Sequence, residues 1–248
     1  MDKLTALIDG DILVYSVGFV SQIQEQVESQ YVNGELIFEG GLMTIPSSWE
    51  ETTHTTDCMI NNICSQVEAT DYKIYLSDTY TFRDDLPNID YKGNRNNPKP
   101  YWYYAIRNYL LNNHGAEIGL DIEADDMMGI HQTDKTIICS IDKDLLQIPG
   151  RHFNWKSKEY KNITEQQGDM FKWRQVLSGD PIDNIPGLPK IGKQKAYNFV
   201  KMYYNDKDFV DKIKFLYILF YGPENGLNVY EDTVKAITIL QEYPNVAP

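Results

Sequence analysis

The 248-residue sequence predicts an α/β fold in which a mostly parallel central sheet is flanked by helices, with a smaller helical subdomain after it. Short apolar runs end in acidic residues where a helix or turn begins, which is how an open α/β sheet presents ligands at the carboxyl ends of its strands. A stretch rich in proline and glycine then separates two helical segments. The composition, 42% hydrophobic and 24% charged, suits one large domain or a core with a small subdomain.

Composition also narrows the class of protein. No run approaches the ~20 apolar residues of a membrane span, and the amino terminus lacks the basic and apolar segments of a signal peptide. Three cysteines without a CxxC pair make a disulfide framework unexpected, and His54 with Cys58 and Cys64 is a weak zinc pattern. We therefore expect a cytoplasmic monomer that has no membrane partner.

The net charge of -13 argues, taken alone, against a nucleic-acid partner, because binding phosphates normally needs a basic face. However, ten of the 36 acids fall in five groups, four of which lie at predicted strand ends or helix starts. Removing these ten leaves 26 acids against 23 bases, a residual charge of -3. Bound divalent cations would largely neutralise the ten, which are Asp9, Asp11, Asp78, Glu123, Asp125, Asp126, Asp142, Asp144, Asp180 and Asp183.

The first predicted strand is the apolar run 4–8, which ends in Asp9-Gly-Asp11. Asp9 is the better candidate ligand, whereas Asp11 is also a candidate cap for the helix that follows. Residues 22–54 carry an Asn-Gly turn between β-prone residues, which predicts a small hairpin inserted after this helix. Residues 57–69 have apolar side chains at helical spacing and should cover the sheet.

The next predicted strand, residues 73–78, again ends in an acid. The segment after it combines cations with aromatic side chains, a mixture suited to binding a single nucleic-acid strand by charge and stacking. For the aromatic residues 102–104 we favour a structural role in the amphipathic helix 102–111. For Lys92 and Arg95 we favour a functional role.

A third acidic group lies at a predicted helix start within residues 120–129 and consists of Glu123, Asp125 and Asp126. The helix dipole favours acids in a first turn, so a structural reason is available. Yet three carboxylates beside a sheet edge would repel one another unless cations hold them. A bound metal is therefore the economical explanation.

The clearest strand is predicted at residues 135–141, which are nearly all β-prone, as in a buried parallel strand. It ends in Asp142-Lys-Asp144, and residues i and i+2 of an extended segment share a face, so both carboxylates can point into one site. A short β excursion is predicted over residues 151–161. Residues 164–177 form a predicted helix that begins with a capping box.

This helix leads to residues 179–196, which join Asp180 and Asp183 to a loop punctuated by prolines and glycines. Prolines fix φ and glycines allow φ > 0, so we expect a rigid turn whose free N–H groups lie beside the positive end of the next helix, where phosphates can bind. Four lysines and no acid occur between Asn184 and Asn205. Three further helices are predicted, at 193–204, 209–221 and 233–243.

These motifs resemble those of the 5′-nuclease family, which includes bacteriophage 5′-to-3′ exonucleases, flap endonucleases and the 5′-nuclease domain of bacterial DNA polymerase I. The similarity spans roughly residues 4–200 and is greatest to the compact phage exonucleases. The matching motifs are Asp-Gly-Asp at 9–11, Tyr-Lys-Gly-Asn-Arg at 91–95, Glu-Ala-Asp-Asp at 123–126, Asp-Lys-Asp at 142–144, Gly-Asp-x-x-Asp at 179–183 and Asp-Asn-Ile-Pro-Gly-x-Pro-x-Ile-Gly-x-x-x-Ala at 183–196.

The resemblance implies a PIN-like 5′-nuclease core with a mostly parallel sheet, followed by a helix-three-turn-helix subdomain. On this basis residues 1–160 are the catalytic core, with a short arch region at about 79–110. Residues 161–221 are the DNA-binding subdomain, and residues 222–248 are a carboxyl-terminal helix and tail. A phage origin would place the protein in the host cytoplasm.

The resemblance also assigns roles to individual residues. Lys92 and Arg95 would contact the scissile phosphate, and Tyr91 and the upstream Arg83 are matched as well. The loop would bind duplex DNA, commonly around a potassium ion, through Gly187, Lys190, Gly192, Lys193 and Lys195. The expected metal ligands are Asp9, Asp78, Glu123, Asp125, Asp126, Asp142, Asp144, Asp180 and Asp183.

Ligands that are all oxygen suit magnesium or manganese, so we hypothesise hydrolysis of phosphodiesters with two metal ions. The first ion, bound chiefly by Asp9, Asp78, Glu123 and Asp125, would activate the attacking water. The second, bound by the remaining five acids, would stabilise the leaving 3′ oxygen. The family likeness implies 5′-phosphorylated products released from duplex ends, nicks or flaps, in DNA replication or degradation.

Three other functions fit parts of the pattern. An aspartyl-phosphate phosphohydrolase needs few accessory acids, so it leaves the acids at 123–126 and the lysine-rich loop without a role. A DNA-binding accessory protein would bind duplex without cleaving it, although the full set of acids argues against a lost activity. A PIN-like ribonuclease usually lacks the helix-three-turn-helix element. The balance between exonuclease and flap activity is not determined by the sequence.

Overall fold

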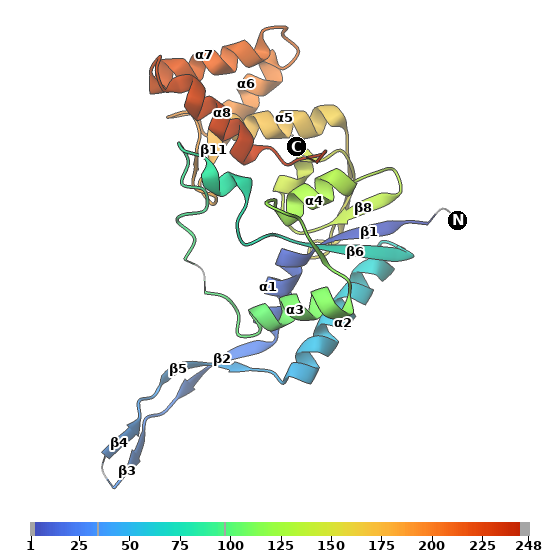
Figure 1. Ribbon diagram of the computed structural model, residues 1–248, viewed down its shortest axis with the longest axis vertical. Helices are drawn as coiled ribbons and strands as arrows, with labels where there is room; N and C mark the ends of the chain where they lie inside the picture. Colours follow the sequence, from blue (N-terminus) through green and yellow to red (C-terminus); the bar gives the residue numbers. More distant parts are fainter. Residues whose placement is uncertain (1–2, 34, 97, 244–248) are drawn as a thin grey trace.

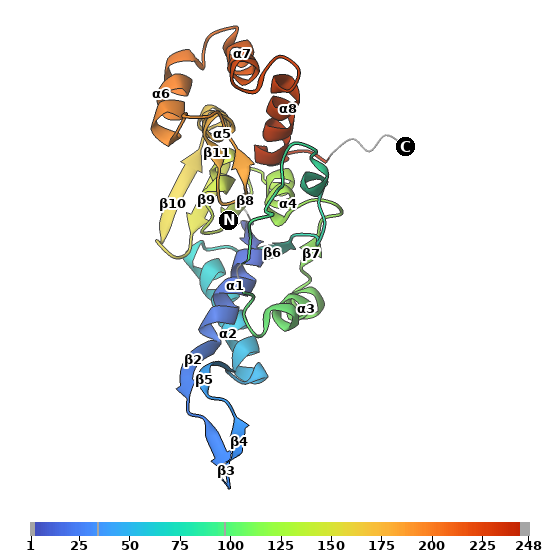
Figure 2. The same ribbon diagram turned by 90° about the vertical axis from the view of Figure 1, so that its left-hand side faces the viewer.

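A computed structural model describes residues 3–33, 35–96 and 98–243, and its centre is a six-stranded sheet with the order β10-β9-β8-β1-β6-β7 (Figures 1 and 2). Only the edge pair β9 and β10 is antiparallel. The prediction of a mostly parallel sheet is therefore confirmed. The strands are β1 (Thr5–Asp9), β6 (Asp71–Leu76), β7 (Glu117–Ile118), β8 (Thr136–Cys139), β9 (Gly150–Asn154) and β10 (Glu159–Ile163).

Helices cover both faces of this sheet, as Figure 1 shows. They are α1 (Gly10–Val20), α2 (Trp49–Gln66), α3 (Tyr103–Asn113) and α4 (Ala124–His131). Side chains alternate along a strand, so Ala6 and Ile8 of β1 pack with α1, α2 and α3, while Leu7 packs on the opposite face with α4. Because both faces of the central strands β1 and β8 are buried, these two strands are nearly continuous apolar runs.

The second part of the molecule contains α5 (Glu165–Ser178), α6 (Lys193–Tyr203), α7 (Phe209–Tyr221) and α8 (Gly226–Ile237), with a short pair of strands, β11 (Gly179–Asp180) and β12 (Ile185–Pro186). The predicted capping box of α5 is confirmed, since Thr164 and Gln167 bond to each other's backbone N–H groups. One hydrophobic cluster joins all four helices and also includes Leu86, Ile89 and Tyr91. The division of the chain at residues 160 and 221 stays a prediction.

Two predicted helix boundaries are wrong. Helix α2 begins at Trp49 rather than at residue 57, because Ser48 and Glu51 form a capping box that starts it earlier. The last helix runs from Gly226 to Ile237 instead of from 233 to 243. Gly226 packs directly on the backbone of Ile218 in α7, where a Cβ would lie 2.5 Å from its Cα, so tertiary packing determines this start.

The hairpin predicted after α1 is confirmed and is longer than expected. Strands β2 (Gln22–Val27) and β5 (Gly41–Pro46) pair antiparallel, and β3 (Gln30–Val32) pairs with β4 (Glu35–Phe38) beyond them. This ribbon, residues 22–46, extends away from the sheet at the end opposite α5–α8 (Figure 1). Asn33 has φ 52°, as the predicted Asn-Gly turn requires, and Gly34 lies outside the described residues.

The distal ribbon contributes little to the core, because its apolar side chains remain exposed, for example Leu36 at 51% and Leu42 at 69%. We expect that replacing residues 25–43 with an Asn-Gly turn between Gln24 and Thr44 shifts Tm by only about 1–2 °C, since surface changes cost about 0.5 kcal/mol. Thermal unfolding of the two proteins measures this shift. A Tm loss above about 5 °C would show that the ribbon supports the core.

Within the described residues, no helix combines the length and the apolar character that crossing a membrane requires.

Candidate active site

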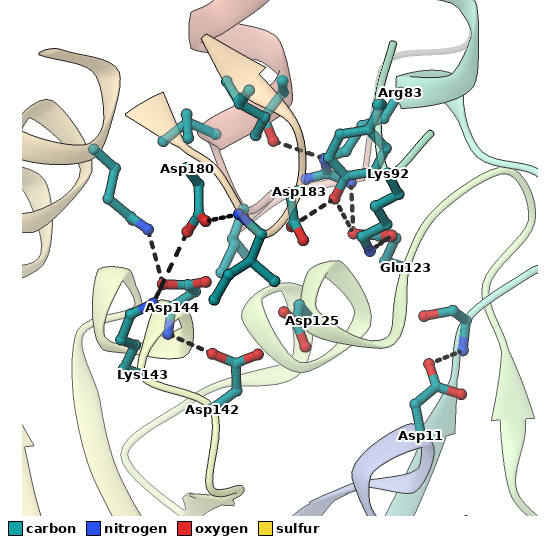
Figure 3. Close-up of a pocket in the computed structure, with 18 of the residues that line it drawn as sticks. Asp11, Arg83, Lys92, Glu123, Asp125, Asp142, Lys143, Asp144, Asp180 and Asp183 are labelled. Carbon is teal, nitrogen blue, oxygen red and sulfur yellow. Dashed lines mark hydrogen bonds and ion pairs between the residues drawn. The ribbon is translucent and has the colours of Figure 1, made fainter. Parts of the chain in front are cut away.

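The candidate site is a pocket of about 220 Å³ where the carboxyl ends of β1, β6 and β8 meet the start of α4 and the β11–β12 turn (Figure 3). Its lining is unusually rich in charge, with eight carboxylates and four cationic side chains. The acids are Asp9, Asp11, Glu123, Asp125, Asp142, Asp144, Asp180 and Asp183, and the bases are Arg83, Lys92, Arg95 and Lys143. Seven of the nine predicted metal ligands are therefore brought together.

Asp9 lies at the end of β1 and caps α1, and only 2% of it is exposed. One oxygen accepts the N–H of Ile12 at 3.0 Å, and the other accepts the Ser140 hydroxyl at 2.7 Å. Burial, with repulsion from Asp11 and Asp142, raises the pKa of Asp9 to about 7 although these hydrogen bonds oppose the shift. A carboxylate in this state is stabilised by any nearby cation.

Asp142 and Asp144 follow β8 and are held by a chain of hydrogen bonds. The Ser140 hydroxyl accepts the N–H of Asp142 at 2.9 Å, and Asp142 Oδ1 accepts the N–H of Asp144 at 2.9 Å. The Gln175 side chain on α5 donates to Asp144 at 2.8 Å. Burial, followed by repulsion from Asp142, raises the pKa of Asp144 to about 6.

Glu123 and Asp125 come from the start of α4 and have opposite electrostatic environments. Burial and then repulsion from Asp9, Asp142 and Glu123 raise the pKa of Asp125 well above its usual range. Burial also opposes ionisation of Glu123, but the positive charges of Lys92 and Arg83 outweigh it and lower the pKa of Glu123. A cation bound beside Asp125 would therefore relieve the repulsion that this carboxylate experiences.

Asp180 and Asp183 reach the pocket because the chain turns tightly after α5. Gly179 has φ 67° and its N–H lies against Gly187, where a Cβ on Gly187 would come within 2.1 Å. Asp180 Oδ1 accepts the N–H of Ile182 at 2.9 Å, which closes the turn. The Asp183 side chain pairs with Arg95, and its backbone carbonyl accepts the N–H of Lys92 at 2.9 Å.

The predicted phosphate-contacting residues lie on the same side of the pocket. Lys92 forms an ion pair with Glu123, and Arg95 forms one with Asp183. The Tyr91 hydroxyl donates to Glu123 Oε2 at 2.9 Å and lies 3.4 Å from Asp183 Oδ2. Residues 91–95 therefore contact both the start of α4, about 30 residues later in the chain, and the β11–β12 turn, about 90 residues later.

Asp126 faces away from the pocket. Both its oxygens bind the Arg83 guanidinium, at 2.5 and 2.9 Å, and accept the N–H groups of Glu123 and Leu240. Arg83 is 2% exposed and also donates to the carbonyls of Ala236 and Thr238. Although Arg83 borders the pocket, its donors join α4 to the carboxyl-terminal end of α8.

Asp78 is also outside the pocket lining. Its oxygens accept the backbone N–H groups of Thr79 at 2.6 Å and Asp121 at 3.3 Å. Asp11, for which capping was an alternative, instead pairs with Arg107 at 2.6 Å and accepts the N–H of Ser77 at 3.0 Å. Asp9 is the residue that caps α1. The alternative prediction that Asp11 caps this helix is therefore wrong.

Sequence reasoning missed the hydrogen-bonding and charged partners of the acids, namely Ser140, Lys143 and Gln175. Lys143 lies 3.5 Å from Asp144 and 3.9 Å from Asp180. Its position between two acids in the Asp-Lys-Asp motif was the available signal. Ser140 and Gln175 carry no signal in the sequence, because the fold alone brings them to Asp9 and Asp144.

The predicted DNA-binding loop lies between β12 and α6. Lys190, Gly192, Lys193 and Lys195 are exposed, and Gly192 caps α6 without a side-chain hydrogen bond. Gly187 is half-buried, and its carbonyl accepts the Tyr221 hydroxyl at 2.6 Å. Four of the five predicted loop residues are therefore accessible to a ligand.

The residues present fit divalent metal ions by chemistry, although no three His, Cys, Asp or Glu side chains within the described residues are already arranged around one point. The donors are all carboxylates, which suit magnesium or manganese. Burial and mutual repulsion raise the pKa values of Asp9, Asp125 and Asp144, and cations bound among them would relieve that repulsion. Lys92 and Arg95 now offset part of the same negative charge.

No protein-family model matches the chain. A 5′-3′ exonuclease of Buchnera aphidicola subsp. Acyrthosiphon pisum (strain APS) is 33% identical over 113 residues, which are 38% of this chain and 40% of that protein. A 5′-3′ exonuclease of Buchnera aphidicola subsp. Schizaphis graminum (strain Sg) is 26% identical over 233 residues, 86% of this chain and 75% of that protein. The chain thus spans less than half of the first relative.

Among solved structures, the bacteriophage T5 flap endonuclease in a pseudo-enzyme-product complex with DNA and metal ions has a TM-score of 0.66 to this chain. The two are 13% identical, and the match covers 95% of this chain and 89% of that one. This likeness confirms the predicted fold. The two sequence relatives confirm the resemblance that the motifs indicated.

Proposed function

We propose that this chain is a member of the 5′-nuclease family, a metal-dependent 5′-to-3′ exodeoxyribonuclease that also cleaves 5′ flaps, as its similarity to 5′-3′ exonucleases supports. One observation carries the proposal: seven predicted metal-binding acids line one pocket beside Lys92 and Arg95. A pocket with this lining can bind a phosphodiester only together with cations, because the acids alone would repel it.

Two divalent ions, magnesium or manganese, would be bound by Asp9, Glu123, Asp125, Asp142, Asp144, Asp180 and Asp183. When bound, such ions supply activation of water and compensation of negative charge on the phosphate and the leaving oxygen. Asp126 is outside the proposed set because Arg83 occupies both its oxygens. Asp78 is outside it because it does not line the pocket.

Lys92 and Arg95 are positioned to bind the non-bridging oxygens of the substrate phosphate. Their charges now compensate Glu123 and Asp183 across the pocket, and metal ions on these acids would free them for the substrate. The Tyr91 hydroxyl would continue to orient Glu123. Lys92 and Arg95 would thus each pair with an acid in the free protein and with the substrate phosphate during the reaction.

The substrate proposed for this site is duplex DNA with a 5′ end, a nick or a flap. The exposed lysines at the start of α6 and the uncapped N–H groups of that helix support binding of duplex phosphates. A potassium ion in the loop, and action as a monomer, belong to the same proposal. The short arch at about 79–110 is part of the proposal as well.

Cleavage of a labelled nicked duplex and of a matched 5′-flap duplex, each with magnesium and with EDTA, tests the function. We expect magnesium-dependent release of the 5′ label as mono- or short oligonucleotides, and the ratio of the two rates ranks the exonuclease and flap activities. Binding without cleavage in magnesium and in manganese would contradict the proposal and favour an accessory DNA-binding role.

Lys92→Ala is expected to lower kcat on the nicked duplex by roughly 100-fold, the usual cost of removing one group that stabilises developing charge. Affinity for the duplex in EDTA should change little, since one of several phosphate contacts is lost. The control is Lys161→Ala, whose side chain is half exposed and pairs with Glu159. Equal kcat values for the two variants would contradict a role of Lys92 in the reaction.

A further inference from the structure

A second, smaller pocket of about 150 Å³ opens beside the active site, between α5, α6 and the loop after β8. Lys143, Gln175 and Asp180 line both pockets, so the two are neighbours. Figure 3 shows Lys143 beside Asp144 and Asp180, on the side of the active site away from Lys92. The second pocket adds Arg174 and Lys193.

This pocket has the opposite charge to the active site. Three cations, Lys143, Arg174 and Lys193, line it against the single acid Asp180, in a chain whose net charge is -13. They come from the loop after β8, from α5 and from the first turn of α6. Lys143 already lies near Asp144 and Asp180, whereas Arg174 and Lys193 form no ion pair among the described residues, so an anion in this pocket would be attracted by two uncompensated cations.

Arg174 gives independent support for a ligand. Its Nε atom is buried and has no hydrogen-bond partner among the described residues. The guanidinium lies over the rings of Phe171, at 5.6 Å, and Tyr197, at 5.1 Å, which orient it without using its N–H donors. A buried N–H left unpaired is unfavourable, and an oxygen ligand would satisfy it.

The backbone at this pocket also favours an anion. Lys193 is the first residue of α6, an 11-residue helix whose cap residue Gly192 provides no side-chain acceptor. The first N–H groups of α6 therefore lie at the positive end of the helix dipole beside the Lys193 side chain. The pocket volume is several times the roughly 30 Å³ of a water molecule, which leaves room for a phosphate group.

We propose that Lys143, Arg174 and Lys193, here called the basic pocket, bind one phosphate group of the strand whose neighbouring phosphodiester is cleaved. The proposal rests on the nuclease function proposed above. Phosphate contacts position a nucleic acid without reading its sequence, so this contact would determine which bond lies over the acidic pocket. Arginine suits the role because its planar fork binds two phosphate oxygens.

The test is a single-position scan with DNA, measured as binding in EDTA at fixed salt. Each nicked duplex carries one uncharged methylphosphonate near the 5′ end, and one further duplex has a 5′-hydroxyl in place of the 5′-phosphate. For the wild-type chain, one change should weaken binding by about tenfold, as expected for loss of a charged hydrogen bond. An internal position or the terminal phosphate then identifies the source of the bound group.

Arg174→Gln and Lys193→Gln should each bind that modified duplex and its unmodified parent with equal affinity. The variant lacks the cation that would contact this phosphate, so removing the phosphate charge has no further effect. The matched control Lys201→Gln, an exposed lysine in the last turn of α6, should keep the tenfold difference. The ratio is measured on each folded variant, and Lys193→Gln carries the test if Arg174→Gln does not fold.

Two results would overturn the basic pocket. One is a wild-type chain that is insensitive to every single-phosphate change, and the other is a pair of variants that keep the wild-type sensitivity. The nuclease proposal is judged separately, by magnesium-dependent cleavage of the unmodified duplex. If the chain cleaves DNA but the variants do not lose sensitivity to one phosphate, the basic pocket alone is rejected. If the variants lose that sensitivity but the chain does not cleave DNA, the nuclease function alone is rejected.

Discussion

Asp125→Asn is expected to lower metal-dependent cleavage by at least about 100-fold, because even groups that only support metal ligands cost 10–100-fold when removed. Burial, followed by repulsion from Asp9, Asp142 and Glu123, raises the pKa of Asp125. The amide keeps the size of the side chain but removes the charge that would bind the cation. Initial rates on the nicked duplex at saturating magnesium measure the loss.

The same substitution should not weaken the metal-free fold, since it removes one of several repelling buried charges. In EDTA, we expect the Tm of Asp125→Asn to equal or exceed that of the wild type. Magnesium should then raise the wild-type Tm by more than it raises the variant's, because ligand binding stabilises only the state that binds. Wild-type cleavage by the variant, or a rise in Tm with magnesium as large as that of the wild type, would contradict the assignment of Asp125 to the metal site.

Asp126→Asn, at the adjacent position, should have the reverse effect and destabilise the fold by about 3–5 kcal/mol, as breaking a buried ion pair does. Asp126 is fully buried and binds Arg83 through both oxygens. Without the negative charge, the 2%-exposed Arg83 would be left uncompensated in the core. Urea unfolding in EDTA measures the loss, and the two asparagine variants serve as controls for each other.

A double-mutant cycle with Arg83→Met and Asp126→Leu separates the ion pair from other effects of either change. We expect each single variant to be strongly destabilised and the double variant to recover much of the loss, because apolar residues can replace a buried pair once both charges are gone. Additive losses would mean that the two residues stabilise the fold independently, contrary to the bidentate geometry.

The sequence predicted those helix starts and turns that depend only on neighbouring residues in the chain. The capping box at Thr164 starts α5, and Asn33 in the ribbon has the positive φ that the predicted turn requires of it. The helix boundaries that were missed have different causes. The start of α8 depends on close packing against α7, and that contact is invisible in the residues around Gly226.

The chemistry of the site was also readable in the residues, because carboxylates grouped at strand ends restrict the partners to cations whatever the details of the fold. Which acids share the site was decided by three-dimensional structure. Asp125 and Asp126 are neighbours on a helix, where one residue turns the side chain by about 100°, so one enters the pocket and the other meets Arg83. The type of ligand is a property of each side chain, whereas its direction and partners depend on contacts between segments far apart in the chain.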